Sequence, residues 1–471
     1  MKKHLFIAFL FFSQMTGYAQ SNGHISIGII QPKVYLVKDD WFQQLNFDLN
    51  IENKTSETIE LDEIELYVYD ENDNIVSIKR LYDGGVSSSI RTIPVRQIAP
   101  EKKLTVYNPF TVFHPSVDLH RLKYILFFTG DSQNRYTAEI DIRPELYIPK
   151  TELTLPLNGK LFVVDGNDLY SNHRRFDIND PMVHELLDMH TTPGLFAIDF
   201  SIIDSLGKKY SGERENGNYA IFGETVYAPA GGKIVKTSNE YEDNIPGKMN
   251  FTLQDMKANK GLFPGNCVVI DHLNGEYSFL VHLKKGSVRV REGEMVTQGQ
   301  PVGEVGNSGS SMYPHLHYQL CDGADYLRSN GLPVYFHAYN RIAGEERIEK
   351  GYLNTGDIVE PVSPLSERIG KKESLQFDTL AKNKEINFWY EQSEHNPYLN
   401  LLRSKYPVDS LIKDLSSDRE KASVILNWVH RQWKHDGGNE PIRNDAISIL
   451  EEAREGSIFV VWNTELWPRH A

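Results

Sequence analysis

Short runs of alternating apolar and polar residues fill residues 24–148. They include "HISIGII", "LNFDLNIEN", "IELYVYDEN", "LKYILFFTG" and "TAEIDI", separated by turn-rich pieces such as "DENDN" and "YDGG". Alternation with a period of two is typical of strands that have one buried and one exposed face. Several such strands joined by turns predict an antiparallel β-sandwich with an immunoglobulin-like layout. Because no cluster of potentially catalytic residues lies here, we interpret this stretch as a packing, spacing or binding module.

Residues 150–361 are also rich in strand-like runs, but glycines stand at the ends of these runs. The clearest examples are "YAPAGGKIV", "GNCVVIDHLNGEYSFLVHL" and "VREGEMVTQGQPVGEVGNSG". The pattern predicts a second, mostly antiparallel β domain. A connector, "PKTELTLPLNG", precedes it, and the turn-rich "TGDIVEPVSPLSE" leads out of it into a predicted linker over residues 362–385.

Helical spacing replaces the alternation in residues 386–471. In "SSDREKASVILNWVHRQWKH" the apolar residues that recur at helical spacing are Ala422, Ile425, Leu426, Val429 and Trp433. Ser417 and Glu420 have the spacing of a capping box at the start of this helix. A second short helix is predicted in "NDAISILEEAREG". The predicted fold class is therefore mainly β: a sandwich, a central antiparallel β domain and a short α-helical C-terminal segment.

The first residues have the order of an export signal. "MKK" gives a basic start, "LFIAFLFF" a short apolar region, and "TGYAQ" small residues at its end. We therefore predict a signal peptide over residues 1–19, cleaved after Ala19. No Cys follows it, which argues against a lipid anchor, and no later segment has the length and apolarity of a membrane span. We expect an exported protein, periplasmic or extracellular, with no integral membrane segment.

Composition adds two limits. The chain of 471 residues is 40% hydrophobic and 24% charged, which is ordinary for a globular protein. Its net charge of -14 argues against a nucleic-acid partner, because phosphate binding relies on clustered Lys and Arg. Oligomeric state is not indicated.

The two cysteines, Cys267 and Cys321, lie in apolar strand-like runs. Both a disulfide and two core thiols fit that setting, and the choice stays open.

A group of His and Asp residues in the second domain predicts metal chemistry. In "MYPHLHYQL", His315 and His317 would share one face of a strand. Asp199 lies in the apolar run "LFAIDFSI", where a carboxylate is costly unless it is paired or coordinated. His282 lies in "SFLVHLKKGS". Catalytic zinc takes three protein ligands, commonly imidazole and carboxylate, and keeps one position open. Asp199 and His317 are therefore candidate ligands.

The motifs "AIDF", "GETVYAPAGGKIV" and "GNCVVIDHLNGEYSFLVHLKKGSVRVREGEMVTQGQPVGEVGNSGSSMYPHLHYQL" occur in an order that resembles the lysostaphin-type zinc metallopeptidases. These murein endopeptidases have a compact, mostly antiparallel β fold, the duplicated hybrid motif. The resemblance covers roughly residues 150–361. It implies a Zn²⁺ cofactor, with Asp199, His317 and one upstream His as ligands. It also implies that His282 and His315 are the catalytic histidines.

The third ligand departs from the family's commonest pattern. That pattern places a His four residues before the Asp, where this chain has Leu195. His190 is the nearest upstream His, but "NDLYSNHRRFDINDP" resembles a subgroup in which the His precedes the Asp motif by a longer loop. We therefore predict His173 as the metal ligand and keep His190 as the alternative.

The resemblance implies an exported zinc endopeptidase that cleaves peptidoglycan cross-links or stem peptides. A bound water loses a proton to one imidazole, His315, while the other, His282, steadies the oxyanion of the tetrahedral intermediate. The alternative is a catalytically inactive relative that binds peptidoglycan and regulates another cell-wall hydrolase. A third interpretation is a structural or adhesion protein in which a closed metal site serves stability. The predicted partner is peptidoglycan or another peptide substrate.

The C-terminal residues 386–471 resemble the beginning of a transglutaminase-like domain, through "ILNWVHRQWKHDGGNEP" and "DAISILEEAREG". That family uses a Cys nucleophile at the start of a following helix, and residues 322–471 contain no Cys. We therefore expect a truncated segment without thiol catalysis. A shifted reading frame in the codons for "IFVVWNTELWPRHA" is one explanation, which sequencing of the gene tests.

Overall fold

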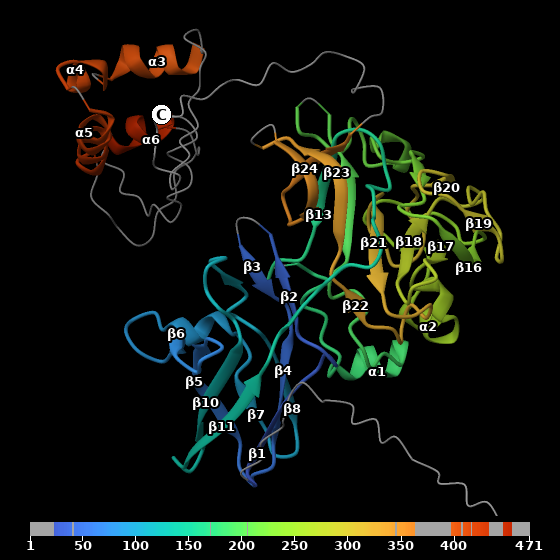
Figure 1. Cartoon of the computed structure of the whole chain (residues 1–471), viewed down its shortest axis with the longest axis horizontal. Helices are drawn as coiled ribbons and strands as arrows, with labels where there is room; N and C mark the ends of the chain where they lie inside the picture. The colour runs from blue at the N-terminus through green and yellow to red at the C-terminus, as the bar shows by residue number, and fades with distance from the viewer. Residues whose placement is uncertain are drawn as a thin grey trace, which may run out of the picture. The chain divides into compact units, whose positions relative to one another are not determined.

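The structure is a computed structural model in which the chain is mainly β, as predicted (Figure 1). It describes residues 23–39, 42–169, 171–204, 206–343, 346–362, 397–406, 408–415, 417–432 and 446–454. The chain divides into two compact units, residues 1–370 and 371–471. The predicted signal peptide, all of the predicted linker but its first residue, and the tail after residue 454 lie outside the described residues. The finer domain bounds, 24–148 and 150–361, stay predictions.

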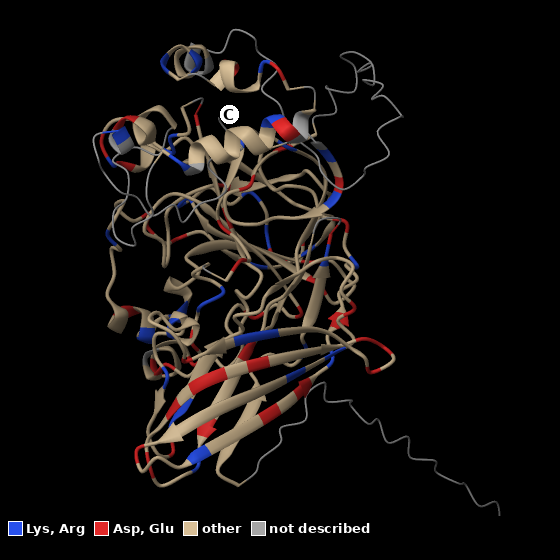
Figure 2. Cartoon of the chain, turned by 90° about the vertical axis from the view of Figure 1, so that its left-hand side faces the viewer, with Lys and Arg blue, Asp and Glu red and all other residues tan. Residues whose placement is uncertain are grey.

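Two antiparallel sheets enclose a single apolar core in the first 142 residues. In the central strand β10 every second residue is buried, which is the alternation that the sequence carries. Acidic and basic side chains are interspersed on the outer faces of these strands (Figure 2). One sheet contains β1 (Ile25–Ile29), β4 (Asp48–Asn53) and β8 (Lys103–Tyr107), and the other contains β5 (Ile59–Tyr69), β6 (Ile75–Tyr82), β7 (Gln97–Ile98), β10 (Arg121–Gly130) and β11 (Arg135–Ile142).

A small third sheet joins this sandwich to the rest of the unit. It consists of β2 (Tyr35–Lys38), β3 (Gln43–Leu45), β9 (Val112–Phe113) and β12 (Glu145–Leu146). Val37 of β2 is buried in the core of the following domain. The hydroxyl of Tyr335 accepts a hydrogen bond from the Lys38 amide at 2.9 Å. The sandwich and the following domain are thus in direct contact within one compact unit.

A large sheet with antiparallel neighbours dominates residues 150–361. Its strands lie in the order β19-β16-β17-β18-β21-β14-β13-β25-β23-β24, and β22 pairs with β21. The pair β15 (Thr225–Tyr227) and β20 (Pro301–Glu304) packs beside it. The strands of the large sheet are β13 (Leu161–Asp165), β14 (Ile198–Ile202), β16 (Gly232–Ser238), β17 (Asn266–Asp271), β18 (Tyr277–Leu283), β19 (Met295–Val296), β21 (Leu316–Cys321), β22 (Gly331–Leu332), β23 (Tyr335–Arg341), β24 (Glu346–Tyr352) and β25 (Ile358–Pro361).

Helices are short in the first unit and make up the described part of the second. The first unit has α1 (Pro181–Leu187) and α2 (Leu253–Ala258), with single 3-10 turns at Ser89–Thr92, Asn216–Asn218 and Lys260–Leu262. The second unit has α3 (Pro397–Lys405), α4 (Val408–Ile412), α5 (Asp418–His430) and α6 (Ala446–Arg454). Among the described helices, none is long and apolar enough to cross a bilayer.

The predicted apolar face of α5 is partly wrong. Ser417 does cap the helix, since its hydroxyl accepts a hydrogen bond from the Glu420 amide. Leu426, however, is 71% exposed. Trp428 instead packs against Tyr406, with ring centroids 6.0 Å apart. The covered side of the helix therefore includes Trp428 and leaves out Leu426, unlike the face that the spacing predicts.

Candidate metal centre

Asp199 and His317 face each other across two neighbouring strands. Asp199 is the second residue of β14 and His317 is the second residue of β21, and the two are paired directly in the antiparallel register. Side chains of directly paired residues project from the same face of a sheet. Nδ1 of His317 donates to Oδ1 of Asp199 at 3.0 Å. The strand ladder thus fixes these two groups relative to each other.

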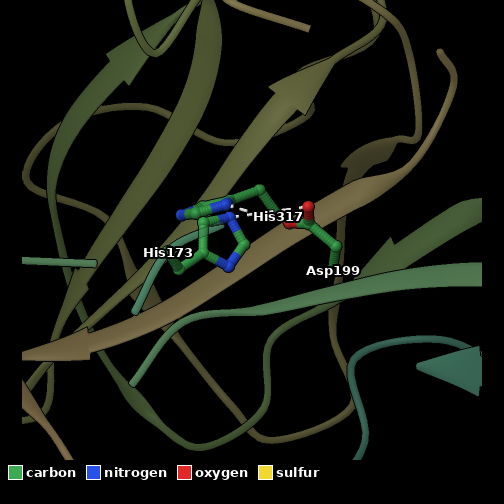
Figure 3. Close-up of side chains that lie close together, drawn as sticks. All are labelled: His173, Asp199 and His317. Atoms are coloured by element: carbon green, nitrogen blue, oxygen red, sulfur yellow. Dashed lines mark hydrogen bonds and ion pairs between the residues drawn. The ribbon is translucent and has the colours of Figure 1, made fainter. Parts of the chain in front are cut away.

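His173 completes the group from a loop. It lies between β13 and α1, and its Nε2 is 3.5 Å from Oδ2 of Asp199. Its ring stands edge-on to that of His317, with centroids 4.7 Å apart (Figure 3). Among the described residues, Nδ1 of His173 is buried without a hydrogen-bond partner. One ligand atom each from His173, Asp199 and His317 can be chosen so that all three lie within 4.8 Å of one another.

The charges of this group suit a bound cation. Burial alone would raise the pKa of Asp199, but the surrounding imidazoles of His173, His315 and His317 outweigh it and lower that pKa. Burial lowers the pKa of His173. His317 is the opposite case: burial acts to lower its pKa, but the hydrogen bond to Asp199, the charge of that carboxylate and the contact with Gln319 together outweigh burial and raise the pKa. The hydrogen between Nδ1 of His317 and Oδ1 of Asp199 lies where a metal bound to both atoms would lie. Two imidazoles and one carboxylate are a donor set that Zn²⁺ accepts.

His282 and His315 lie beside this group and are held in matching tautomers. Nδ1 of His282 donates to the Ser308 carbonyl at 2.8 Å, and Nδ1 of His315 donates to the Tyr313 carbonyl at 2.7 Å. In its neutral form, each ring therefore has an unprotonated Nε2. Nε2 of His315 is 3.5 Å from Oδ2 of Asp199. The ring centroids of His282 and His315 are 5.0 Å apart.

His282 has an unusual environment. Its φ is +65°, a left-handed value that non-glycine residues seldom adopt. Burial, followed by the charges of His315 and His317, lowers its pKa well below the usual range. Such backbone strain persists only where the surrounding structure enforces it, and it clusters at functional sites. Here the strand register shifts at His282, because Leu283 pairs with Asn266 and Val281 pairs with Cys267. The Ser308 carbonyl holds the ring through Nδ1.

Two glycines hold the loop that carries this carbonyl. Gly265 and Gly309 both have positive φ, +66° and +77°. A Cβ on either residue would lie 2.6 Å from the backbone nitrogen of the other. Only glycine allows that approach. The "GNSGSS" stretch thus positions the main chain next to His282.

The structure leaves several candidates outside the group. The His190 side chain is 64% exposed, and its Nε2 bonds to Asp188 at 3.1 Å. Cys267 and Cys321 are free and buried in a small apolar cluster. A contact that the sequence analysis did not identify is Gln319, whose Oε1 lies 3.0 Å from Nε2 of His317. Its position two residues after His317, on the same strand face, was the available signal.

Comparison with known proteins identifies the central part of the chain. Residues 218–329 match peptidase family M23, so this chain contains a peptidase M23 domain. The matched stretch includes His282, His315 and His317, whereas His173 and Asp199 precede it.

Two curated relatives come from Vibrio cholerae serotype O1 (strain ATCC 39315 / El Tor Inaba N16961). Peptidoglycan DD-endopeptidase ShyA is 30% identical over 125 residues, which is 26% of this chain and 21% of the relative. Peptidoglycan DD-endopeptidase ShyC is 40% identical over 64 residues, 14% of each chain. The chain thus spans about a fifth or less of the length of these relatives. Among solved structures, the catalytic domain of lysostaphin from Staphylococcus simulans is 22% identical, with 26% of this chain and 86% of that chain covered and a TM-score of 0.17.

Proposed function

We propose that this chain, whose residues 218–329 form a peptidase M23 domain, is an exported zinc endopeptidase that hydrolyses peptide bonds of peptidoglycan. The observation that carries the proposal is the convergence of His173, Asp199 and His317 beside two further imidazoles. In this proposal the first three residues hold Zn²⁺. When bound, zinc polarises a carbonyl group and lowers the pKa of water.

The chain's own groups would move the proton. In the neutral ring of His315, the hydrogen lies on Nδ1, which donates to the Tyr313 carbonyl, and Nε2 carries the lone pair. This nitrogen lies 3.5 Å from the carboxylate of Asp199, at the edge of the ligand group. We assign it the proton taken from the attacking water, which it then delivers to the leaving amine.

His282 would act on the oxyanion. That role needs a protonated ring, and its lowered pKa keeps the ring neutral in the absence of substrate. A developing oxyanion would raise this pKa, because an opposite charge nearby favours the protonated form, and the ring would then take up a proton from solvent. The contact with the Ser308 carbonyl holds Nδ1, so that Nε2 is the atom available to the substrate. The products are a free carboxylate and a free amine.

The test combines zinc content with the release of amines from purified peptidoglycan. Wild type should carry one zinc per chain and release amines. His317→Ala and His173→Ala should bind zinc much more weakly and should release no amines. The matched control is His190→Ala, an exposed histidine away from the group, which should keep both. Full zinc content and activity in His317→Ala would refute the proposal. Zinc binding without amine release in wild type would favour the non-catalytic peptidoglycan-binding alternative.

A further inference from the structure

The loop that carries His173 is anchored to the N-terminal sandwich. Arg174, the next residue, directs its side chain away from the ligand group toward β4. Its Nη1 pairs with Oδ1 of Asp48, and its Nη2 donates to the Phe47 carbonyl at 2.6 Å. The side chains of Arg174 and Asp48 are 0% and 2% exposed. An ion pair this deeply buried lies in a low dielectric, so its geometry is tightly constrained.

Asp48 is itself held by Gln31, so the pair is part of a fixed network. Gln31 donates from Nε2 to Oδ2 of Asp48 at 2.8 Å, and its Oε1 accepts from the Asp48 amide at 2.8 Å. Burial raises the pKa of Asp48, and the guanidinium of Arg174 opposes that rise. The carboxylate therefore needs its arginine partner to stay charged. Loss of either partner would leave the other as a buried, uncompensated group.

Further contacts between the sandwich and the same loop lie on both sides of Arg174. The Tyr107 hydroxyl donates to the Arg175 carbonyl at 2.8 Å. Asn46 donates to the Asn167 carbonyl at 2.8 Å. Asn179 donates to Oγ1 of Thr105 at 2.7 Å. The loop runs from β13 to α1 (Figure 1). These bonds attach it to the sandwich near its beginning, at its middle and near its end.

The other two ligands have no such dependence. Asp199 and His317 lie in directly paired strands within the large sheet. We propose that the Arg174–Asp48 pair is the positioning device by which the N-terminal sandwich holds His173 in the metal centre, so that zinc affinity depends on the sandwich. This inference rests on the proposed function. It assigns Arg174 and Asp48 a positioning role, since both contact the loop and the sandwich but neither contacts the ligand atoms.

The test measures zinc dissociation constants of the full chain by competition with a chelator. Asp48→Asn keeps the size of the side chain and removes the charge. It should weaken zinc binding by about 10- to 100-fold, the usual range for residues that support a metal ligand. Arg174→Lys, a milder change that keeps the charge but loses the two-pronged contact, should weaken binding in the same direction. If Asp48→Asn does not fold, Arg174→Lys decides alone.

Two controls separate positioning from general destabilisation. Tyr335→Phe removes a different contact between the sandwich and the following domain, the hydrogen bond with Lys38, and should leave zinc affinity unchanged within about twofold. In a His173→Ala background, Asp48→Asn should have no further effect on zinc affinity, because the ligand that Asp48 helps to position is already removed.

In the metal-free protein, Asp48→Asn should also speed amide hydrogen exchange of residues 171–175 relative to β14 and β21.

The outcomes distinguish this inference from the proposed function. If wild type binds no zinc, or if His173→Ala binds it as tightly as wild type, the proposed function fails and this inference with it. If His173→Ala weakens zinc binding but Asp48→Asn and Arg174→Lys do not, only the positioning role is overturned. An equal loss from Asp48→Asn with and without His173 also overturns it, since the effect would then bypass the loop.

Discussion

The two halves of the candidate metal centre are built in different ways. Asp199 and His317 are directly paired residues of two neighbouring strands in the large sheet. This pairing brings Nδ1 of His317 to 3.0 Å from Oδ1 of Asp199. His173 lies in a loop whose bonds reach a separate β layer. The first half is fixed by local pairing, whereas the second depends on contacts between distant parts of the chain. The candidate site thus combines two residues that strand pairing positions with one residue whose loop is bonded to another β layer.

The largest effect should come from the rigid half. Asp199→Ala removes the carboxylate that lies among four imidazoles, those of His173, His282, His315 and His317. Zinc affinity should fall by more than about 100-fold, beyond the range of 10- to 100-fold that changes to supporting residues cause. Isothermal titration with zinc measures it. Asp188→Ala, at an exposed aspartate that contacts His190, is the control and should bind zinc as wild type does. Equal affinities for the two variants would contradict the assignment of Asp199.

A smaller loss should follow from the support behind His317. Gln319 contacts Nε2 of His317 at 3.0 Å, and Gln319→Leu removes that partner at similar size. Zinc affinity should fall by about 10- to 100-fold. The same titration reports it. The matched control is Gln298→Leu, at a glutamine that bonds only to main-chain carbonyls far from the site. If Gln319→Leu binds zinc as tightly as this control, the strand-borne ligand needs no outer support.

The sequence predicts the positions of Asp199 and His317 better than that of His173. The alternation in "LFAIDFSI" and the His-Leu-His spacing place Asp199 and His317 on strand faces, and the period of two determines which way they point. No period constrains the loop, so His173 and His190 both remained candidates. The partnership of Arg174 with Asp48 joins residues 126 positions apart, and no local pattern signals it. Leu426 shows the same limit, because spacing alone does not say which face of a helix a neighbour covers.

A third change tests the loop next to His282. Gly309→Ala puts a Cβ into a left-handed residue that faces the backbone of Gly265. Stability should fall by about 1–3 kcal/mol, and activity should fall further as the Ser308 carbonyl shifts. Gly286→Ala is the matched control, because Gly286 has nearly the same φ, +73°, with open space around it. Urea unfolding and amine release measure both. Equal losses in the two variants would mean that the close approach of the two loops has no role.

The smallest expected effect is on the pH dependence of unfolding, through His272, which lies directly after β17. Burial lowers the pKa of His272, whose ring bonds to the Gly231 carbonyl and the Ser278 hydroxyl. The unfolded chain therefore binds this proton more readily than the folded one. Its contribution to stability is complete above pH of about 6.5 and is lost as the pH falls below that value. His272→Gln should flatten the pH dependence of unfolding in metal-free protein by less than about 1.4 kcal/mol per pH unit. If the free energy of unfolding of His272→Gln depends on pH as steeply as that of wild type, the assigned contribution of His272 is wrong.

The most direct test of the metal centre is anomalous diffraction at the zinc edge from crystals of the full chain. We predict one strong peak about 2.0–2.2 Å from an imidazole nitrogen of His173, an imidazole nitrogen of His317 and a carboxylate oxygen of Asp199. A zinc peak beside His184 and His190, whose ring centroids are 5.0 Å apart, with no density between the other three residues, would contradict it.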